Sequence, residues 1–264
     1  MPTTSEKITA IKENGYDIDF SRVFENAFEN YKKIALISGI AILLFTLFIL
    51  FVALGLIAIF VGFSAISENI ESINPENFSG VTILIYVLIV GLVAGLASPF
   101  TAGIFKMAHC ADSGTDFSLG TVFDYYSSPY FKQLFIATGL IALISTGITS
   151  LFESFGIRFL GVILTYTISF FTFLVIPLII FGNLKVAEAI KGSFIIVSKQ
   201  FFILLGLLIV AVIMAMLGLI GFCIGIFFTI PFIYSMYYAI YKDSIGFDDE
   251  VEAISEIDKL TGAT

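Results

Sequence analysis

Five long stretches of the sequence contain no Asp, Glu, Lys or Arg, and this feature limits the possible folds more than any other. They cover residues 34–67, 77–105, 133–152, 159–184 and 200–241. A helix that crosses the hydrocarbon of a bilayer needs about 20 apolar residues. Only 13% of all residues are charged, whereas soluble domains have about a quarter. The sequence therefore excludes an ordinary soluble protein and predicts an all-α, polytopic integral membrane protein.

The five stretches are long enough for six transmembrane helices. Residues 200–241 are too long for one span and must fold back, and Gly218 and Gly221 favour a tight reversal between them because glycine adopts turn conformations easily. The six spans are expected near residues 34–60, 81–104, 134–151, 159–181, 201–218 and 222–241.

The positions of the Lys and Arg residues predict the orientation, because cytoplasmic loops retain positive charge. With both termini on the cytoplasmic side, 12 of these 13 residues are cytoplasmic and only Arg158 lies outside. The first apolar run is much longer than the core of a secretory signal peptide, so we expect the first span to act as the insertion signal. The sequence predicts a multi-pass protein of the bacterial cytoplasmic (inner) membrane with both termini in the cytoplasm.

Three regions follow from this topology. Residues 1–18 are polar and predicted to be disordered, residues 19–242 form the six-span membrane domain, and residues 243–264 form an acidic cytoplasmic tail. The formal net charge is −8 and no basic stripe is present, so binding of nucleic acid is not expected. The two cysteines, Cys110 and Cys223, do not form a disulfide framework.

Residues 20–31 have the pattern of an amphipathic helix lying in the inner-leaflet interface. Arg22, Glu25, Asn26, Glu29 and Asn30 are assigned to its polar face. Its apolar residues recur at helical spacing: Phe20, Val23, Phe24, Ala27, Phe28 and Tyr31. Lys32 and Lys33 follow at the expected headgroup level, where long cationic side chains reach the polar region.

The same segment recurs before the third and the fifth span. Asp19-Phe20-Ser21 is echoed by Asp116-Phe117-Ser118, and Phe123 stands nine residues before Lys132. A more diverged copy covers residues 186–198 and leads to Lys199. Lys33, Gln133 and Gln200 each precede a glycine by six residues: Gly39, Gly139 and Gly206. We therefore expect three pseudo-repeated hairpins, each preceded by an in-plane amphipathic helix, at about 19–111, 112–183 and 184–242.

Prolines and paired glycines indicate how the spans bend and pack. Pro99, Pro177 and Pro231 lie late in the second, fourth and sixth spans, where each is expected to bend its helix near the cytoplasmic end. The pairs Gly91/Gly95 and Gly221/Gly225 have the small-xxx-small spacing that lets helix backbones approach closely, although glycine is also common in spans.

Two of these regions resemble a known family. Pro177-Leu178-Ile179-Ile180 followed by Glu188-Ala189-Ile190, and Pro99 to Gly103 followed by residues 112–118 and Phe123, are similar to uncharacterised bacterial polytopic membrane proteins related to the membrane domain of glycerophosphoryl diester phosphodiesterase. The resemblance covers most of residues 20–241. It implies a membrane fold and not the phosphodiesterase activity, which in fused members belongs to a separate soluble domain.

The sequence offers little for catalysis, so neither an enzyme nor a cofactor is expected. His109 is the one histidine. Its neighbours Cys110 and Asp112 leave a helix in different directions, so we expect an interfacial histidine rather than a metal ligand. Glu68, Glu71 and Glu76 are expected to form a solvated loop rather than a cation site. The hydroxyls within the spans are expected to bond backbone carbonyls or bridge helices.

Two functions remain open. The first is a structural or interaction component whose in-plane helices engage the lipid bilayer or a partner, which could be another membrane protein or a second copy. The second is a transporter or flippase for a lipid or another apolar molecule. It predicts an enclosed cavity between the hairpins, lined by Ser and Thr of the middle spans, and it needs no charge inside the bilayer, where ion-coupled carriers usually have one.

Overall fold

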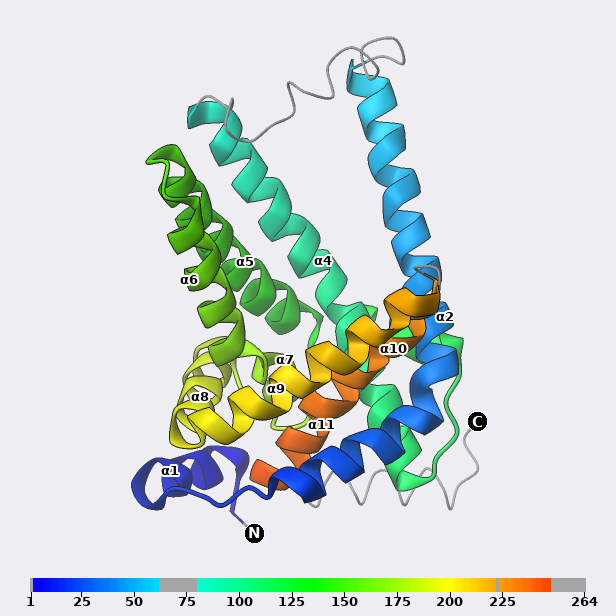
Figure 1. The fold of residues 1–264 in the computed structure, drawn as a ribbon, viewed down its shortest axis with the longest axis vertical. Coiled ribbons are helices and arrows are strands. Elements are labelled where there is room, and N and C mark those ends of the chain that lie inside the picture. Colours follow the sequence, from blue (N-terminus) through cyan, green and yellow to red (C-terminus); the bar gives the residue numbers. More distant parts are fainter. Residues whose placement is uncertain (1, 62–79, 222–223, 248–264) are drawn as a thin grey trace.

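The computed structural model describes residues 2–61, 80–221 and 224–247, and within these ranges the chain is helical with no β-strand (Figure 1). Five helical segments in the described part are long and apolar enough to cross a membrane. They are Phe20–Val52, Gly80–Ser113, Phe131–Ser154, Arg158–Ile180 and Phe201–Ile220. The all-helical class and the multi-pass character predicted from the sequence are therefore confirmed. The acidic loop with Glu68, Glu71 and Glu76 lies outside the described residues.

Helix α2, Phe20–Val61, joins the predicted in-plane segment and the first span in one helix. Its first half crosses the lower end of the molecule in Figure 1, and its second half rises away from that end. We call this end, which also holds α1, η3 and α8, the base. The buried residues of the first half recur every three or four positions, as expected for one packed face of a helix: Val23, Ala27, Asn30, Ile34, Ser38 and Ala41.

Helices α4 (Gly80–Ser113), α5 (Phe131–Ser154) and α6 (Arg158–Thr172) stand side by side. The α4–α5 contact depends on glycine. A Cβ atom added to Gly95 would lie 2.9 Å from the Phe135 carbonyl oxygen, and one added to Gly139 would lie 3.2 Å from that of Gly91. Gly91 and Gly95 lie in this close contact, and Gly139 provides the facing surface on α5.

The three prolines have different effects. Pro99 is buried inside α4, which continues through it, and the Ser98 hydroxyl donates to the Gly95 carbonyl (2.7 Å) that the proline leaves without its amide partner. A break at residues 173–174 separates α6 from α7 (Val175–Ile180), which contains Pro177. Pro231 is the first residue of α11, just after α10 ends. Helix interruptions therefore accompany Pro177 and Pro231.

The third hairpin differs from the first two. Helix α9 (Phe201–Met216), the 3₁₀ helix η4 (Leu217–Gly221), α10 (Gly225–Thr229) and α11 (Pro231–Ser244) cross the molecule obliquely in Figure 1 and end beside α2. The reversal overlaps the predicted one. Gly221 and Gly225 do not share a helix, so this predicted pair is wrong: Gly225 instead meets Gly218 across the reversal.

The N-terminal segment is ordered, contrary to the disorder predicted for residues 1–18. Helix α1, Thr4–Asn14, begins with a capping box in which Thr3 and Glu6 satisfy each other's backbone amides. Ile8 and Ile11 are buried, Ile8 against Gly192 of α8 (Val186–Lys199). Beyond α1, the Tyr16 hydroxyl donates to the Ile196 carbonyl (3.3 Å), and burial raises the pKa of this phenol. The capping residues and the helical spacing of Thr4, Ile8 and Ile11, four and then three residues apart, are signals that a reading based on polarity misses.

The three predicted in-plane segments are helical but not alike. The first continues into its span as α2, the second is the 3₁₀ helix η3 (Leu119–Tyr126), and the third is α8, which ends at Lys199 before α9 begins. The repeat glycines also differ: Gly39 lies against the Phe227–Phe228 backbone and Gly139 against α4, whereas the Phe20 ring is 3.4 Å from a Cβ placed on Gly206. A common fold for the three repeats stays a prediction.

Candidate functional site

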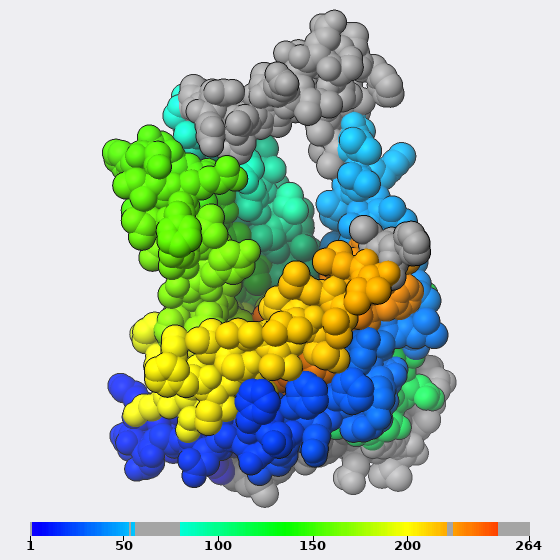
Figure 2. Space-filling model, in the orientation of Figure 1, coloured from blue at the N-terminus to red at the C-terminus, as the bar shows by residue number. Residues whose placement is uncertain are grey.

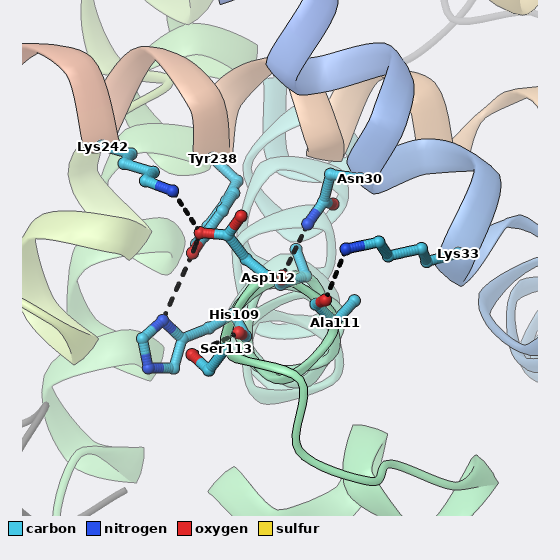
Figure 3. A network of polar contacts seen from close by, with 9 residues as sticks. Asn30, Lys33, His109, Ala111, Asp112, Ser113, Tyr238 and Lys242 are labelled. Atoms are coloured by element: carbon cyan, nitrogen blue, oxygen red, sulfur yellow. Dashed lines mark hydrogen bonds and ion pairs between the residues drawn. The ribbon is translucent and has the colours of Figure 1, made fainter. Parts of the chain in front are cut away.

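A polar network joins the base ends of α4 and α11 (Figure 3). Asp112, near the end of α4, accepts hydrogen bonds from the Tyr238 hydroxyl (3.1 Å) and from the Lys242 ammonium (2.5 Å). The Asp112 and Lys242 side chains are only partly covered, so this ion pair contributes less than about 1 kcal/mol to stability. Its main consequence is positional, because one carboxylate holds two residues of α11 against α4.

His109 extends this network by one group. Its Nδ1 lies 3.3 Å from the Tyr238 hydroxyl oxygen, and since that hydroxyl donates to Asp112, the histidine nitrogen is the donor to the tyrosine. Phe181 and Phe247 flank the imidazole at ring-centroid distances of 5.4 and 4.6 Å. His109 therefore acts in the structure as a packed, hydrogen-bonded connector between elements of the base.

Two side chains of α2 reach the same end of α4. The Asn30 amide donates to the Ala108 carbonyl (2.6 Å) and accepts from the Ser235 hydroxyl of α11 (3.0 Å), and the Lys33 ammonium donates to the Ala111 carbonyl (3.0 Å). Lys33 thus places a cation at the C-terminal end of α4, where the helix dipole favours it. Together with Asp112 and Tyr238, these contacts connect α2, α4 and α11 at one point of the base.

The predicted interfacial aromatic residues of α2 are covered mainly by protein. Phe24 and Phe28 are half-buried, and their rings meet the buried Phe232 of α11 at 5.9 and 6.3 Å. Phe20 remains exposed. The apolar face of the predicted amphipathic helix therefore packs largely on α11, because the third hairpin lies alongside it, and this part of the interfacial prediction is corrected.

The predicted interfacial lysines lie on the surface of the base. Lys32 pairs with Glu29 (2.5 Å) and lies 5.4 Å from the centre of the Phe28 ring, and Lys132 and Lys199 are exposed. Phe123 of η3 is also exposed, although its ring meets Phe100 of α4 at 6.2 Å. These positions agree with a surface at headgroup level.

Hydroxyl groups within the spans bond backbone carbonyls, as the sequence predicted. Thr138 donates to Leu134 (2.8 Å) within α5, and Thr229 donates to Ala215 (2.6 Å) between α10 and α9. Thr149 of α5 and Thr165 of α6 meet at 2.5 Å. The hydroxyls of Thr149, Thr165 and Thr229 connect neighbouring helices, and none of the hydroxyls named here lines the cavity described next.

A cavity of about 500 Å³ lies where α2 leaves the base. One wall comes from α2, with Ala41, Leu44, Phe45 and Phe48, and the other from η3, with Leu119, Val122, Phe123 and Tyr126. It is partly open and apolar. This position differs from the enclosed, Ser- and Thr-lined cavity that a transporter predicted, because the middle-span hydroxyls are engaged between helices.

Three residues of these sites were not identified from the sequence. Asn30 was assigned to the polar face of its helix, although it stands seven residues after Val23 and three after Ala27 and so shares their buried face. Gly103 lets α4 meet the backbone of Val122, with which a Cβ atom would collide. Tyr238 of α11 is buried and joins His109 to Asp112. Helical spacing could have identified Asn30, whereas the other two depend on tertiary contacts.

Among residues 2–61, 80–221 and 224–247, no group of three or more His, Cys, Asp or Glu side chains is placed to hold a metal ion. Comparisons with protein-family models, curated proteins and solved structures find no match to this chain. The relation to the phosphodiesterase-associated membrane family consequently stays a prediction.

Proposed function

We propose that this chain is a six-span protein of the bacterial inner membrane that acts as a structural or interaction component, with the base on the cytoplasmic side. The observation that carries the proposal is the layer of elements at the base, in which α1 packs on α8, the first half of α2 packs on α11, and η3 packs on α4. Contacts join this layer to the ends of α4, α9 and α11. A layer held at several points presents a fixed surface to the inner leaflet or to a partner.

The sixth span in this proposal is the segment made of α10 and α11. These helices together cover residues 225–244, about the length that a span needs, and are separated only at Ile230. Orientation can be tested in a variant that has Cys110 and Cys223 replaced by Ser. A single Thr115→Cys in the base should react with a membrane-impermeant maleimide only from the cytoplasmic side, and a single Ser154→Cys only from the opposite side. Reaction of both from one side would contradict the topology.

The functional role can be tested with exposed rings of the base. Phe194 of α8 and Phe202 of α9 are each more than half exposed, as are Phe155 and Phe159 at the far end of the molecule. We expect Phe194→Ser with Phe202→Ser to impair growth under envelope stress in a strain that depends on this protein, because the surface presented at the base changes. The matched control, Phe155→Ser with Phe159→Ser, should support growth. Equal growth of both double variants at equal expression would reject the interfacial role.

Movement of a lipid or an apolar molecule is a second candidate. Figure 2 shows the molecule hollowed between the upper parts of α2 and α4. Both helices carry exposed apolar side chains, including Leu47, Leu50, Leu84 and Leu88. An opening with apolar walls suits cargo that needs no charged site. A scrambling assay in vesicles tests this directly, and lipid transfer no faster than in protein-free vesicles would exclude it.

A further inference from the structure

The walls of the cavity between α2 and η3 favour an apolar occupant over bound water. Its walls are apolar side chains, and the one polar group among the lining residues, the Tyr126 hydroxyl, donates to the Leu96 carbonyl (2.9 Å). A water molecule needs two to four polar partners to occupy a buried site. The volume of about 500 Å³ lies within the range of pockets that hold small ligands, roughly 300 to 1,000 Å³. The occupant that fits such walls is apolar.

The aromatic rings of the cavity wall are fixed by packing against α4. Phe45 of α2 stacks on the buried Phe100 of α4 at 4.0 Å with an interplanar angle of 10°, and Phe123 of η3 meets the same ring edge-on. Gly103 and Val122 bring α4 and η3 into backbone contact just beside these rings. Because two elements are fixed to α4 in this way, the cavity has a defined shape.

The location of the cavity points to a membrane lipid. Ala41 and Phe48 stand 8 and 15 residues after Lys33, or at most about 12 and 22 Å further along the helix, which is within the thickness of a hydrocarbon layer of about 30 Å. The exposed side chains of Leu44 and Phe48 continue the cavity wall into the outward-facing apolar surface of α2. Lipid chains can therefore enter from the side.

A charged pair beside the cavity matches a particular headgroup. Asp124, which follows Phe123, pairs with Lys106 of α4 at 2.7 Å, and both side chains are over 40% exposed. One cation and one carboxylate at the base side of the cavity are complementary to the phosphate and the ammonium of a zwitterionic phospholipid.

We propose that this cavity binds one acyl chain of a zwitterionic phospholipid, with its headgroup at the Lys106–Asp124 pair. The proposal goes beyond the structural role of the base and rests on it only for the insertion of α2 into the membrane. It assigns a lipid ligand to a defined place rather than to the whole apolar surface.

The experiment uses the absence of tryptophan from the sequence. Phe48→Trp places a single fluorophore in the cavity wall, and Leu92→Trp places one at an exposed position of α4 outside the cavity as a matched control, since the two native side chains are 60% and 52% exposed. Each full-length variant is reconstituted in vesicles that contain increasing fractions of phosphatidylethanolamine brominated on its acyl chains, which quenches nearby tryptophan. We expect half-maximal quenching of Trp at position 48 at a several-fold lower fraction than at position 92.

Cavity-filling variants and a second brominated lipid test which molecule occupies the cavity. Leu119→Phe, which narrows the cavity from its exposed edge, should move the curve of the position-48 reporter toward that of the control, and Ala41→Phe should do the same from the buried side. Brominated phosphatidylglycerol should quench position 48 less effectively than brominated phosphatidylethanolamine. Circular dichroism and gel filtration identify any variant that fails to fold. If one of the two cavity-filling variants fails to fold, the quenching measurement is made with the other.

Several results would overturn the proposal. Coincident quenching curves for tryptophan at positions 48 and 92 would show that the cavity has only the lipid contact of any exposed surface. Stronger quenching by brominated phosphatidylglycerol than by brominated phosphatidylethanolamine would contradict the headgroup assignment. Quenching at position 92 but not at position 48 would mean that a second copy or another molecule covers the cavity. Lack of quenching at both positions would overturn the membrane insertion itself, which distinguishes that failure from failure of the lipid site.

Discussion

The two halves of α2 belong to one continuous helix but have opposite surroundings. In the first half, Val23, Ala27 and Ile34 are fully buried, and the aromatic face packs on α11. In the second half, every described side chain from Thr46 to Gly55 is exposed, and Phe51 reaches 78%. One half is therefore part of the protein interior, and the other has the surface of a helix surrounded by lipid.

The difference follows from side-chain size and polarity rather than from hydrophobicity. The buried face of the first half contains small or polar residues, including Ala27, Asn30 and Ser38, which allow close approach and interhelical hydrogen bonds where apolar surface gives no driving force. The second half has large aliphatic and aromatic residues on all sides. Among membrane helices, a recurring small or polar face thus marks protein contact better than apolar content does.

The largest expected effect comes from the buried amide of the first half. Asn30→Leu leaves the Ser235 hydroxyl and the Ala108 carbonyl without their partner, which should lower the free energy of unfolding by about 3 kcal/mol, since each buried group that loses its partner costs roughly 1 to 3 kcal/mol. The change in the free energy of unfolding is measured by unfolding the protein in detergent micelles titrated with sodium dodecyl sulfate. Asn26→Leu, on the exposed side of the same helix turn, should change stability by less than about 0.5 kcal/mol. Similar losses in both variants would show that the first half is not packed as described.

Enlarging a single side chain should also affect the stability of the protein differently in the two halves of α2. Ala27→Leu adds a branched side chain at a fully buried position and should destabilise the protein by about 2 kcal/mol through overpacking. Thr46→Leu, at an exposed position of the second half, should be neutral in the same titration. A neutral Ala27→Leu would indicate free space behind α2.

Glycine gives a third comparison along the same helix. A Cβ atom at Gly39 would lie 2.6 Å from the Phe228 ring and 3.1 Å from the Phe227 carbonyl oxygen, whereas one at Gly55 meets nothing within 4 Å. Gly39→Ala should therefore cost about 1 kcal/mol, because the neighbouring helix must shift. Gly55→Ala should stabilise the helix by roughly 0.5 to 1 kcal/mol. The opposite order in thermal unfolding would contradict the α2–α10 contact.

The smallest effect concerns the two adjacent lysines. Lys33→Met removes the cation at the C-terminal end of α4 and should cost about 0.5 to 1 kcal/mol at low salt, with less loss at high salt. Lys32→Met removes an exposed pair with Glu29 and the exposed contact with the Phe28 ring and should cost less than about 0.5 kcal/mol. Equal, salt-independent effects would argue against the Lys33 contact with α4.

The all-helical class, the five helices long and apolar enough to cross a membrane, and the helical nature of the in-plane segments could be predicted from the sequence, because charge-free length and helical periodicity determine them locally. The Gly91–Gly95 surface and the interruptions near Pro177 and Pro231 were also predictable, since glycine and proline act through their own backbones. The order of α1 was not, because its stability comes from burial of Ile8 and Ile11 against α8.

The candidate sites were harder to predict because they depend on which helices meet. His109 was expected to be a simple interfacial residue, but its link to Asp112 runs through Tyr238, more than 120 residues away in the chain. The oblique course of the third hairpin covers Phe24 and Phe28, and no local pattern encodes that course. The cavity likewise forms only when η3 packs beside α2, with Gly103 permitting the contact.

A spin-label scan along residues 20–55 in lipid vesicles tests the contrast within α2 most directly. Single cysteines are introduced after replacement of Cys110 and Cys223, and the accessibility of each label to oxygen, which enters the bilayer, and to a polar nickel complex, which does not, is measured. Labels at positions 23, 27 and 34 should be protected from both reagents, and labels at positions 47, 50 and 51 should all be accessible to oxygen and shielded from nickel. A protected stripe that recurs every three to four residues between positions 46 and 55 would contradict this arrangement, because it would show that the second half of α2 is packed against protein along one face.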